Sequence, residues 1–204
     1  MFVYDKINPY KLILGGQHLK QNTLLTLLSQ NTDIMTILTI IDSLNLNDSW
    51  LCAGTLRNFL WNYLSGLPTF DHQTDVDVIF FDATISYEQT LALEKQLLQN
   101  YPVYRWELKN QAYMHTHSPH SLPYLSSQEA ITKFPETCTA IGAKLQKKTK
   151  IIELFTPFGL ADIEQFIVQP TPYFCQDSSR LEVYQNRLLS KKWHEKWPAI
   201  TYKK

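Results

Sequence analysis

Residues 75–81 read DVDVIFF, an acidic pair that leads directly into an apolar run. The run of β-branched and aromatic residues predicts a buried strand at 76–81. Side chains two positions apart on a strand point to one face, so Asp75 and Asp77 are expected to project together while the valines anchor the other face. Two such carboxylates repel each other unless a cation lies between them, and Mg²⁺ or Mn²⁺ suits oxygen ligands. We therefore predict a metal site at Asp75 and Asp77. The alternatives are two solvated acids on a surface strand or a turn capped by Asp75.

A helix that starts at a glycine is predicted upstream of this strand. The apolar residues 50–53 end at Gly54, and apolar residues then recur at helical spacing as far as residue 64. A strand followed by a glycine and a helix directs backbone N–H groups at an anion. Thr55 can cap the helix or bind a phosphate oxygen, and the planar fork of Arg57 matches phosphate geometry. Beside the acidic strand, this arrangement predicts a phosphate site next to the metal site.

These motifs carry a family resemblance. Residues 53–58 read AGTLRN, residues 64–66 read LSG, and residues 75–78 read DVDV. The arrangement resembles the head motif of the DNA polymerase beta-like nucleotidyltransferase superfamily, in the version found in CCA-adding enzymes and bacterial poly(A) polymerases. Ala53 stands where that version has its first glycine, and Asn58 replaces the aspartate that follows the arginine. The resemblance implies a nucleotidyltransferase fold, metal binding at the two aspartates, and nucleotide contacts from Gly54, Thr55, Arg57 and Asn58.

The resemblance extends over most of the chain. From residue 50 to residue 197 the sequence looks like a bacterial nucleotidyltransferase-like family, whose name reflects its fold. The additional shared motifs are WE at 106–107, KNQA at 109–112, MH at 114–115 and PFGL at 157–160.

Members of the superfamily usually need a third carboxylate on a neighbouring strand for two-metal chemistry. Glu107, on a strand predicted at 103–108, is the candidate, and Glu153 on a later strand is the rival. A surface charge paired with a nearby cation is the alternative for Glu107. By the same analogy, Lys109 and Asn110 are expected to contact phosphate or sugar, and plain surface polarity is the alternative for each.

The rest of the pattern predicts a mixed α/β, or α+β, protein, because strands alternate with helices and one hairpin is present. We expect a nucleotidyltransferase-type mixed sheet flanked by helices, with N- and C-terminal helices packed on it. One domain over 1–204 is predicted, with a helical segment at 1–48, a catalytic-type core at 49–170 and a C-terminal helix within 171–204. The other predicted elements are helices at 17–46 (broken at 31–33), 87–100, 127–133, 159–168 and 180–197, and hairpin strands at 141–145 and 151–155.

Composition limits the partners and the location. Basic and acidic residues number 19 each, and a net charge of zero argues against long nucleic acid as a partner. The three cysteines form no C-x-x-C pair, the N-terminus lacks a signal-peptide layout, and no apolar run reaches membrane-spanning length. A cytoplasmic protein with no membrane partner is therefore expected. His115, His117 and His120 lie in loop-like sequence, where a zinc site is the minority interpretation.

Three functions fit these observations. The first is an enzyme that moves a nucleoside monophosphate from a nucleoside triphosphate (NTP) to a hydroxyl acceptor, which is a small molecule, a protein or an RNA end. The second is a non-catalytic nucleotide-binding or protein-interaction module on the same fold. The third is a single-stranded RNA-binding protein that uses its aromatic residues, which would show a steep salt dependence of binding.

Overall fold

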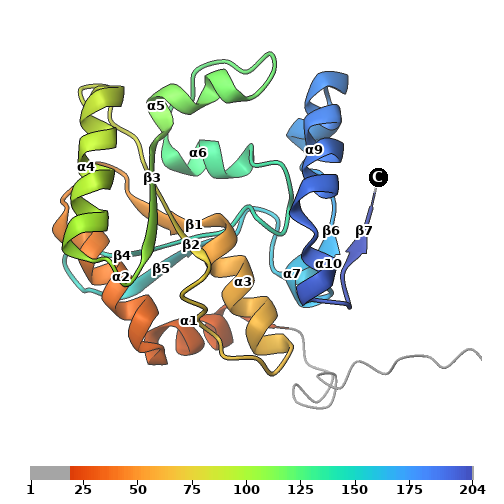
Figure 1. The fold of residues 1–204 in the computed structure, drawn as a ribbon, viewed down its shortest axis with the longest axis horizontal. Helices are drawn as coiled ribbons and strands as arrows, with labels where there is room; N and C mark the ends of the chain where they lie inside the picture. Colours follow the sequence, from red (N-terminus) through yellow and green to blue (C-terminus); the bar gives the residue numbers. More distant parts are fainter. Residues whose placement is uncertain (1–18, 204) are drawn as a thin grey trace, which may run out of the picture.

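A computed structural model of the protein describes residues 19–203 (Figure 1). The described part opens with two helices, α1 (Gln21–Gln30) and α2 (Thr32–Ser43). Asn31 separates them and caps α2, because its side chain accepts a hydrogen bond from Ile34 N at 3.0 Å. The predicted break is confirmed, and the predicted start of this segment at Gln17 lies outside the described residues. No described helix is by itself long and apolar enough to cross a membrane; α1 and α2 would be so only together, and they are bent by 88°.

Five strands form one sheet in the order β3-β2-β1-β4-β5. β1 (Trp50–Cys52) is antiparallel to both of its neighbours, β2 (Asp75–Phe80) and β4 (Gly142–Leu145). β3 (Arg105–Asn110) is parallel to β2, to which α4 (Tyr87–Asn100) connects it. β5 (Ile152–Phe155) completes an antiparallel hairpin with β4. The predicted mixed sheet flanked by helices and the predicted hairpin are therefore confirmed.

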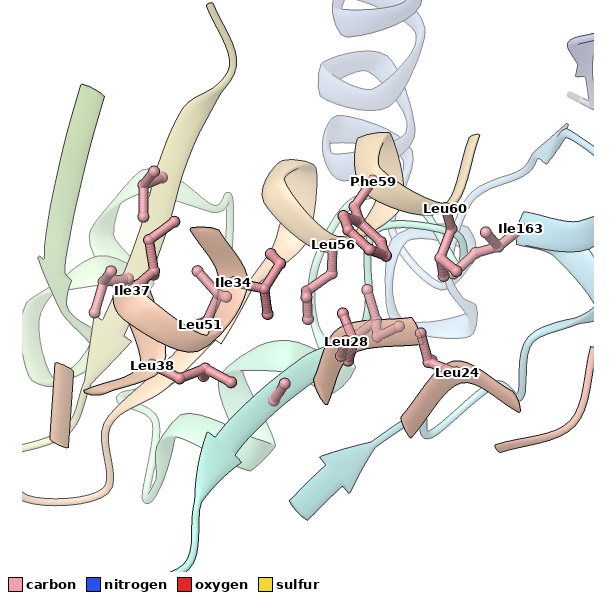
Figure 2. Close-up of a cluster of buried hydrophobic side chains, with 14 of the residues drawn as sticks. Leu24, Leu28, Ile34, Ile37, Leu38, Leu51, Leu56, Phe59, Leu60 and Ile163 are labelled. Carbon is pink, nitrogen blue, oxygen red and sulfur yellow. The ribbon is translucent and has the colours of Figure 1, made fainter. Parts of the chain in front are cut away.

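One face of the sheet carries the main core. α3 (Ala53–Leu64) follows β1 directly, and Figure 2 shows side chains of α1, α2, α3 and β1 pointing toward one another. The fully buried members include Leu24, Ile34, Leu51 and Leu56. Complete burial of such a side chain contributes about 1.5–3 kcal/mol. The core therefore fixes α3 relative to the sheet, and with it the start of α3 relative to the acidic residues of β2.

The opposite face of the sheet carries α6 (Ser127–Thr132) and the acidic pair. A second buried cluster joins Trp50 and Ile79 of the sheet to Ile131 of α6. Gly142 permits this close packing, since a Cβ atom there would lie 2.9 Å from Ile131 Cδ1 and 3.1 Å from Trp50 Cε3. Val76 and Val78 are buried in the main core. The alternating side chains Asp75 and Asp77 consequently project on the α6 face, as predicted.

The segment after β2 shows one difference from the prediction. β3 lies two residues later than the predicted 103–108, because a turn in which Tyr104 N donates to Tyr101 O at 3.2 Å comes first. β3 leads into α5 (Gln111–Met114) and a short 3₁₀ helix, η2 (His115–His117).

The C-terminal part is more broken than the sequence predicts. In place of the helix at 159–168 the structure has α7 (Ala161–Glu164) and strand β6 (Ile167–Val168), separated by a left-handed residue, Phe166. In place of the helix at 180–197 it has α9 (Ser178–Lys191) and α10 (Trp193–Lys196), separated by Lys192 at φ 44°. Two unpredicted elements complete this part, α8 (Pro172–Cys175) and β7 (Thr201–Tyr202), and β7 pairs in parallel with β6 (Figure 1).

Candidate active site

Asp77 of β2 lies at the N-terminus of α3. The backbone N–H of Thr55 donates to Asp77 Oδ2 at 3.2 Å. The Thr55 hydroxyl accepts from Asp77 N at 2.7 Å and donates to Asp75 O at 2.9 Å, which holds the first turn of the helix against the strand. The structure thus brings the acidic strand and the helix start together, as the sequence predicts. The hydroxyl of Thr55 is engaged by the backbone of β2.

The start of α3 has an unusual backbone. The helix begins at Ala53, whose φ of 51° is in the left-handed region that favours glycine. Such a conformation costs a non-glycine residue about 1–2 kcal/mol. Ala53 therefore keeps the backbone expected of the glycine that it replaces in the CCA-adding pattern. At Gly54 a Cβ atom would lie 2.9 Å from Asp77 Oδ2, so the missing side chain is what lets the carboxylate approach this closely.

Glu107 of β3 lies beside Asp77. The parallel register pairs Asp77 with Glu107, so the two side chains share one face of the sheet. Burial, followed by the negative charge of Glu107, raises the pKa of Asp77 to about 7; the charge of Arg57 and the Thr55 N–H act in the opposite direction. A carboxyl group that is destabilised in its charged form by a second carboxylate is a candidate for cation binding.

Asp75 lies at the margin of this arrangement. Its side chain is half exposed, and its Oδ1 atom lies 3.2 Å from Arg105 Nε. Asp77 and Glu107 line the cavity described below, and Asp75 does not belong to its lining. The structure therefore brings one of the two predicted metal ligands together with Glu107 and leaves the other paired with Arg105.

Arg57 is enclosed by protein groups. It is 3% exposed, and its Nη1 atom donates to Thr139 Oγ1 at 3.0 Å. Its Nε and Nη2 atoms donate to Asn58 Oδ1 at 3.2 and 2.8 Å, so the Asn58 amide serves the arginine. The guanidinium also lies over the rings of Trp193 at 4.2 Å and Trp61 at 4.9 Å. All the polar contacts found for Arg57 in the described part of the chain are internal.

Lys109 and Asn110 lie on opposite faces of β3. Lys109 lines the cavity, with Nζ 3.2 Å from Glu94 Oε2 and 3.6 Å from Glu107 Oε1. Asn110 is buried, and its amide exchanges hydrogen bonds with the backbone of the 82–85 loop and of α5. The structure therefore brings Lys109, but not Asn110, to the acidic face.

A cavity of about 360 Å³ lies over the acidic face. Its volume is within the usual range of ligand pockets, about 300–1,000 Å³. Beyond the sheet, its walls come from the segments that follow β3, from residues 133–135 directly after α6, and from α8 and α9. α5 and α6 lie on the same side of the sheet in Figure 1. These walls contribute apolar and basic side chains, among them Met114, Tyr124, Phe134, Phe174, Lys133 and Arg187.

Lys133 and Arg187 were not identified from the sequence. Neither residue belongs to a recognisable motif, since each follows an ordinary amphipathic helical pattern. Only the tertiary arrangement of α6, which Lys133 follows directly, and of α9, which carries Arg187, brings them to the same cavity as Asp77. A periodicity argument predicts which side of a helix is buried, but it does not predict what that side faces.

Glu153, the rival for the third carboxylate, lies elsewhere. β5 is three strands from β2, and at about 4.8 Å per strand this separates the two backbones by roughly 14 Å. The Glu153 carboxylate lies 3.7 Å from Lys144 Nζ. Of the two candidates, Glu107 is therefore the one that shares the cavity with Asp77.

The three histidines have separate environments. His117 lines the cavity, and His120 Nδ1 lies 2.8 Å from Asp177 Oδ2. His115 Nδ1 is buried and has no hydrogen-bond partner within the part of the chain that the structure describes. Among residues 19–203, no three His, Cys, Asp or Glu side chains are grouped closely enough to form a metal site by themselves. A cation at Asp77 and Glu107 would therefore take its other ligands from water and substrate.

The mixed sheet and the acidic cavity at the start of α3 define a protein of the nucleotidyltransferase type. Residues 39–202 match the nucleotidyltransferase family, and the chain belongs to this family. No curated protein matches the chain.

Solved structures agree with this assignment. The chain is 52% identical to a protein whose NMR structure is described as revealing a CCA-adding enzyme head domain, with a TM-score of 0.86 over 90% of this chain and 96% of that one. It is also similar to the Thermotoga maritima CCA-adding enzyme complexed with tRNA, with a TM-score of 0.53 and 12% identity. That match covers 90% of this chain and 42% of the enzyme, and it shows the fold alone.

Proposed function

We propose that the protein transfers a nucleoside monophosphate from an NTP to a hydroxyl acceptor and depends on Mg²⁺ or Mn²⁺. The observation that carries this proposal is the pair Asp77 and Glu107, side by side in one cavity at the N-terminus of α3. Membership of the nucleotidyltransferase family supports the class of reaction.

The donor set fits a hard divalent cation. Mg²⁺ usually binds one or two carboxylates and completes its coordination with water and substrate phosphate, so Asp77 and Glu107 are sufficient. The raised pKa of Asp77, caused by burial and by Glu107, is relieved when a cation lies between the two groups. Asp75 would join them only after leaving Arg105. When bound, the ion supplies charge neutralisation for the phosphates and lowers the pKa of the acceptor hydroxyl.

The other predicted residues support this pair in different ways. The N-terminus of α3 favours an anion in the cavity, and Gly54, which has no Cβ atom, lets the Asp77 carboxylate approach the start of the helix. Thr55 fixes Asp77 through the β2 backbone, while Arg57 supplies a nearby positive charge. Lys109 holds Glu107 on one side and offers a charge to the triphosphate on the other.

The acceptor is proposed to be a small molecule or the end of a larger one. A cavity of about 360 Å³ has room for a nucleotide and little besides, and a net charge of zero gives no field that would hold a long polyanion. An RNA end belongs among the acceptors to be tested, because a similar structure is described as a CCA-adding enzyme head domain.

Replacement of Glu107 tests the proposed site. We expect Glu107→Gln to lower turnover by about 10²–10³-fold, because it removes one oxygen anion that would hold the cation. The measurement is Mg²⁺-dependent release of pyrophosphate, with label transfer from each α-³²P-labelled NTP to small-molecule, protein and RNA acceptors.

Glu153→Gln is the matched control, because Glu153 lies on the same sheet outside the cavity. We expect it to retain wild-type turnover. Nucleotide binding with no release of pyrophosphate from the NTP, whichever acceptor is supplied, would favour the non-catalytic module instead. Equal losses in the two glutamine variants would remove Glu107 from the site.

The pKa of Asp77 predicts how cation binding depends on pH. Its folded value of about 7 exceeds the ordinary value of 3.8, so the bound proton stabilises the metal-free fold fully below pH 3.8. That contribution is lost as the pH rises through about 7. Cation binding needs the ionised Asp77 carboxylate. The apparent affinity for the cation should therefore fall by about tenfold for each pH unit below 7.

We therefore expect Mg²⁺ or Mn²⁺ to raise the thermal midpoint more at pH 8 than at pH 6. Titration of the metal-free protein with each chloride salt at both pH values, followed by thermal unfolding, measures this. KCl at equal ionic strength controls for screening. A stabilisation independent of pH would indicate that the cation binds away from Asp77.

A further inference from the structure

An ion pair between Glu136 and Arg187 lies at the wall of the cavity. Glu136 is completely buried, and its Oε1 atom accepts a hydrogen bond from Arg187 Nε at 2.6 Å. The Glu136 backbone is fixed in a turn, since its carbonyl accepts the N–H groups of Thr139 at 3.1 Å and Ala140 at 3.2 Å. The glutamate therefore offers Arg187 a rigid attachment point.

Stability alone does not explain why an ion pair occupies this position. Only Glu136 is fully removed from water, and the cost of burying its charge offsets much of its attraction to the partly exposed Arg187, so an apolar residue there is often at least as stable. The second oxygen, Glu136 Oε2, is also buried and has no hydrogen-bond partner among residues 19–203. A partly satisfied buried network of this kind calls for another explanation.

Arg187 differs from the other basic residues of the cavity. Lys109 Nζ lies close to Glu94 and Glu107, and Lys133 Nζ lies 2.7 Å from Glu129 Oε1. Arg187 uses Nε for Glu136, while its two terminal nitrogens have no partner within the described part of the chain. Its side chain is 32% exposed and lines the cavity. One edge of the guanidinium is therefore anchored, and its other donors are available to a ligand.

A second cation lies nearby. The guanidinium groups of Arg57 and Arg187 lie 4.2 and 5.8 Å from the ring centre of the same residue, Trp193. Burial first, and to a smaller degree the charge of Arg187, lower the pKa of Arg57. Of the two, Arg187 lines the cavity and Arg57 is buried, so Arg57 adds positive charge near the cavity while Arg187 offers the contact. Positive charge there favours an anionic ligand, and the forked geometry of arginine matches phosphate oxygens.

We propose that Arg187 binds the β- and γ-phosphates of the NTP and that Glu136 is the positioning residue that orients it. The inference rests on the proposed function. In addition to Asp77 and Glu107 on the sheet, it assigns a phosphate contact to the C-terminal helix α9. It assigns the ion pair of Glu136 and Arg187 a role in holding the triphosphate.

Binding of nucleotides with and without the terminal phosphates tests the inference. The affinities of a non-hydrolysable NTP analogue and of the matching nucleoside monophosphate, both with Mg²⁺, are measured by calorimetry. We expect Arg187→Gln to weaken binding of the triphosphate by about 10- to 100-fold and to leave the monophosphate within about twofold. Arg187→Lys should lose less, because it keeps the charge but not the fork. Glu136→Gln should weaken the triphosphate by about 3- to 10-fold.

Controls separate folding from binding. Arg187→Gln alone leaves Glu136 buried and unpaired, so the double variant Glu136→Gln/Arg187→Gln removes both charges and is expected to show the same loss of triphosphate affinity. Lys191→Gln, an exposed position on the same helix, should bind like the wild type. Thermal unfolding of each variant confirms that it is folded under the binding conditions.

The outcomes are distinct. Arg187 variants that retain the preference for triphosphate, or that lose both ligands equally, overturn this inference and leave the proposed function standing. A wild-type protein that binds the triphosphate no better than the monophosphate also overturns it. A wild-type protein that binds no NTP overturns the proposed function as well.

Discussion

Replacing Asp77 by asparagine is expected to abolish metal-dependent turnover, by about 10³-fold or more, while making the metal-free fold more stable at alkaline pH. Asparagine is isosteric and can still accept the Thr55 N–H bond that Asp77 Oδ2 receives at 3.2 Å, so the geometry of the α3 start should persist. The change removes the charge that burial and Glu107 disfavour. The two effects have opposite signs because the Asp77 carboxylate is proposed to act in the reaction, although its negative charge destabilises the fold.

The gain in stability should itself depend on pH. Above about pH 7 the wild-type group is ionised and bears the unfavourable interaction, which amounts to ~1.4 kcal/mol for each tenfold change in proton affinity. We expect the free energy of unfolding of Asp77→Asn to exceed that of the wild type by roughly 1–3 kcal/mol at pH 8 and by little near pH 4. Urea unfolding of metal-free protein at both pH values measures this difference.

Asp75→Asn is the control for the stability change of Asp77→Asn, because Asp75 is half exposed and paired with Arg105. We expect it to change the stability by less than about 1 kcal/mol at either pH. Should Asp77→Asn keep normal turnover, the pair Asp77 and Glu107 would have no part in the reaction. A destabilised Asp77→Asn variant at pH 8 would show that the carboxylate makes a favourable interaction in the fold.

The sequence predicts the acidic strand and the helix start because both depend on local patterns. DVDVIFF alternates at its start and becomes fully apolar, and the residues after Gly54 repeat at helical spacing. Glu107 is a candidate because the family resemblance implies a third carboxylate on a neighbouring strand, and the structure pairs its strand with β2. The local pattern does not reveal that Asp75 pairs with Arg105, because that contact depends on the β2–β3 register.

The remaining walls of the site depend on distant contacts. The broken elements after residue 159 turn at Phe166 and Lys192, non-glycine residues in left-handed conformations that no propensity scale would favour there. The packing of Trp193 against Arg57 overrides local preference in this part of the chain. For this reason the prediction of one continuous helix at 180–197 was wrong, and Arg187 was missed.

Replacing Arg57 by methionine is expected to lower the free energy of unfolding by about 3–5 kcal/mol. The change removes the hydrogen bonds to Thr139 and Asn58 and the contacts with the rings of Trp61 and Trp193. Arg57→Lys should lose nearly as much, since an ammonium group cannot reproduce the planar fork. Urea unfolding at pH 7 measures both variants, and Arg105→Lys, at an exposed position, is the control expected to stay within about 0.5 kcal/mol of the wild type.

The result distinguishes two roles for Arg57. A direct phosphate ligand, as the family resemblance implies, would lose NTP affinity with little change in stability. An internal support would lose stability first, and a folded Arg57→Met variant would also need a higher pH for cation binding, because the Arg57 charge lowers the pKa of Asp77. Since the polar contacts found for the buried guanidinium are with protein groups, we expect the second pattern. In that case Arg57 stabilises the junction of α3 with the C-terminal elements. The direct contact with phosphate is then made by Arg187, which is hydrogen-bonded to Glu136 and lines the cavity.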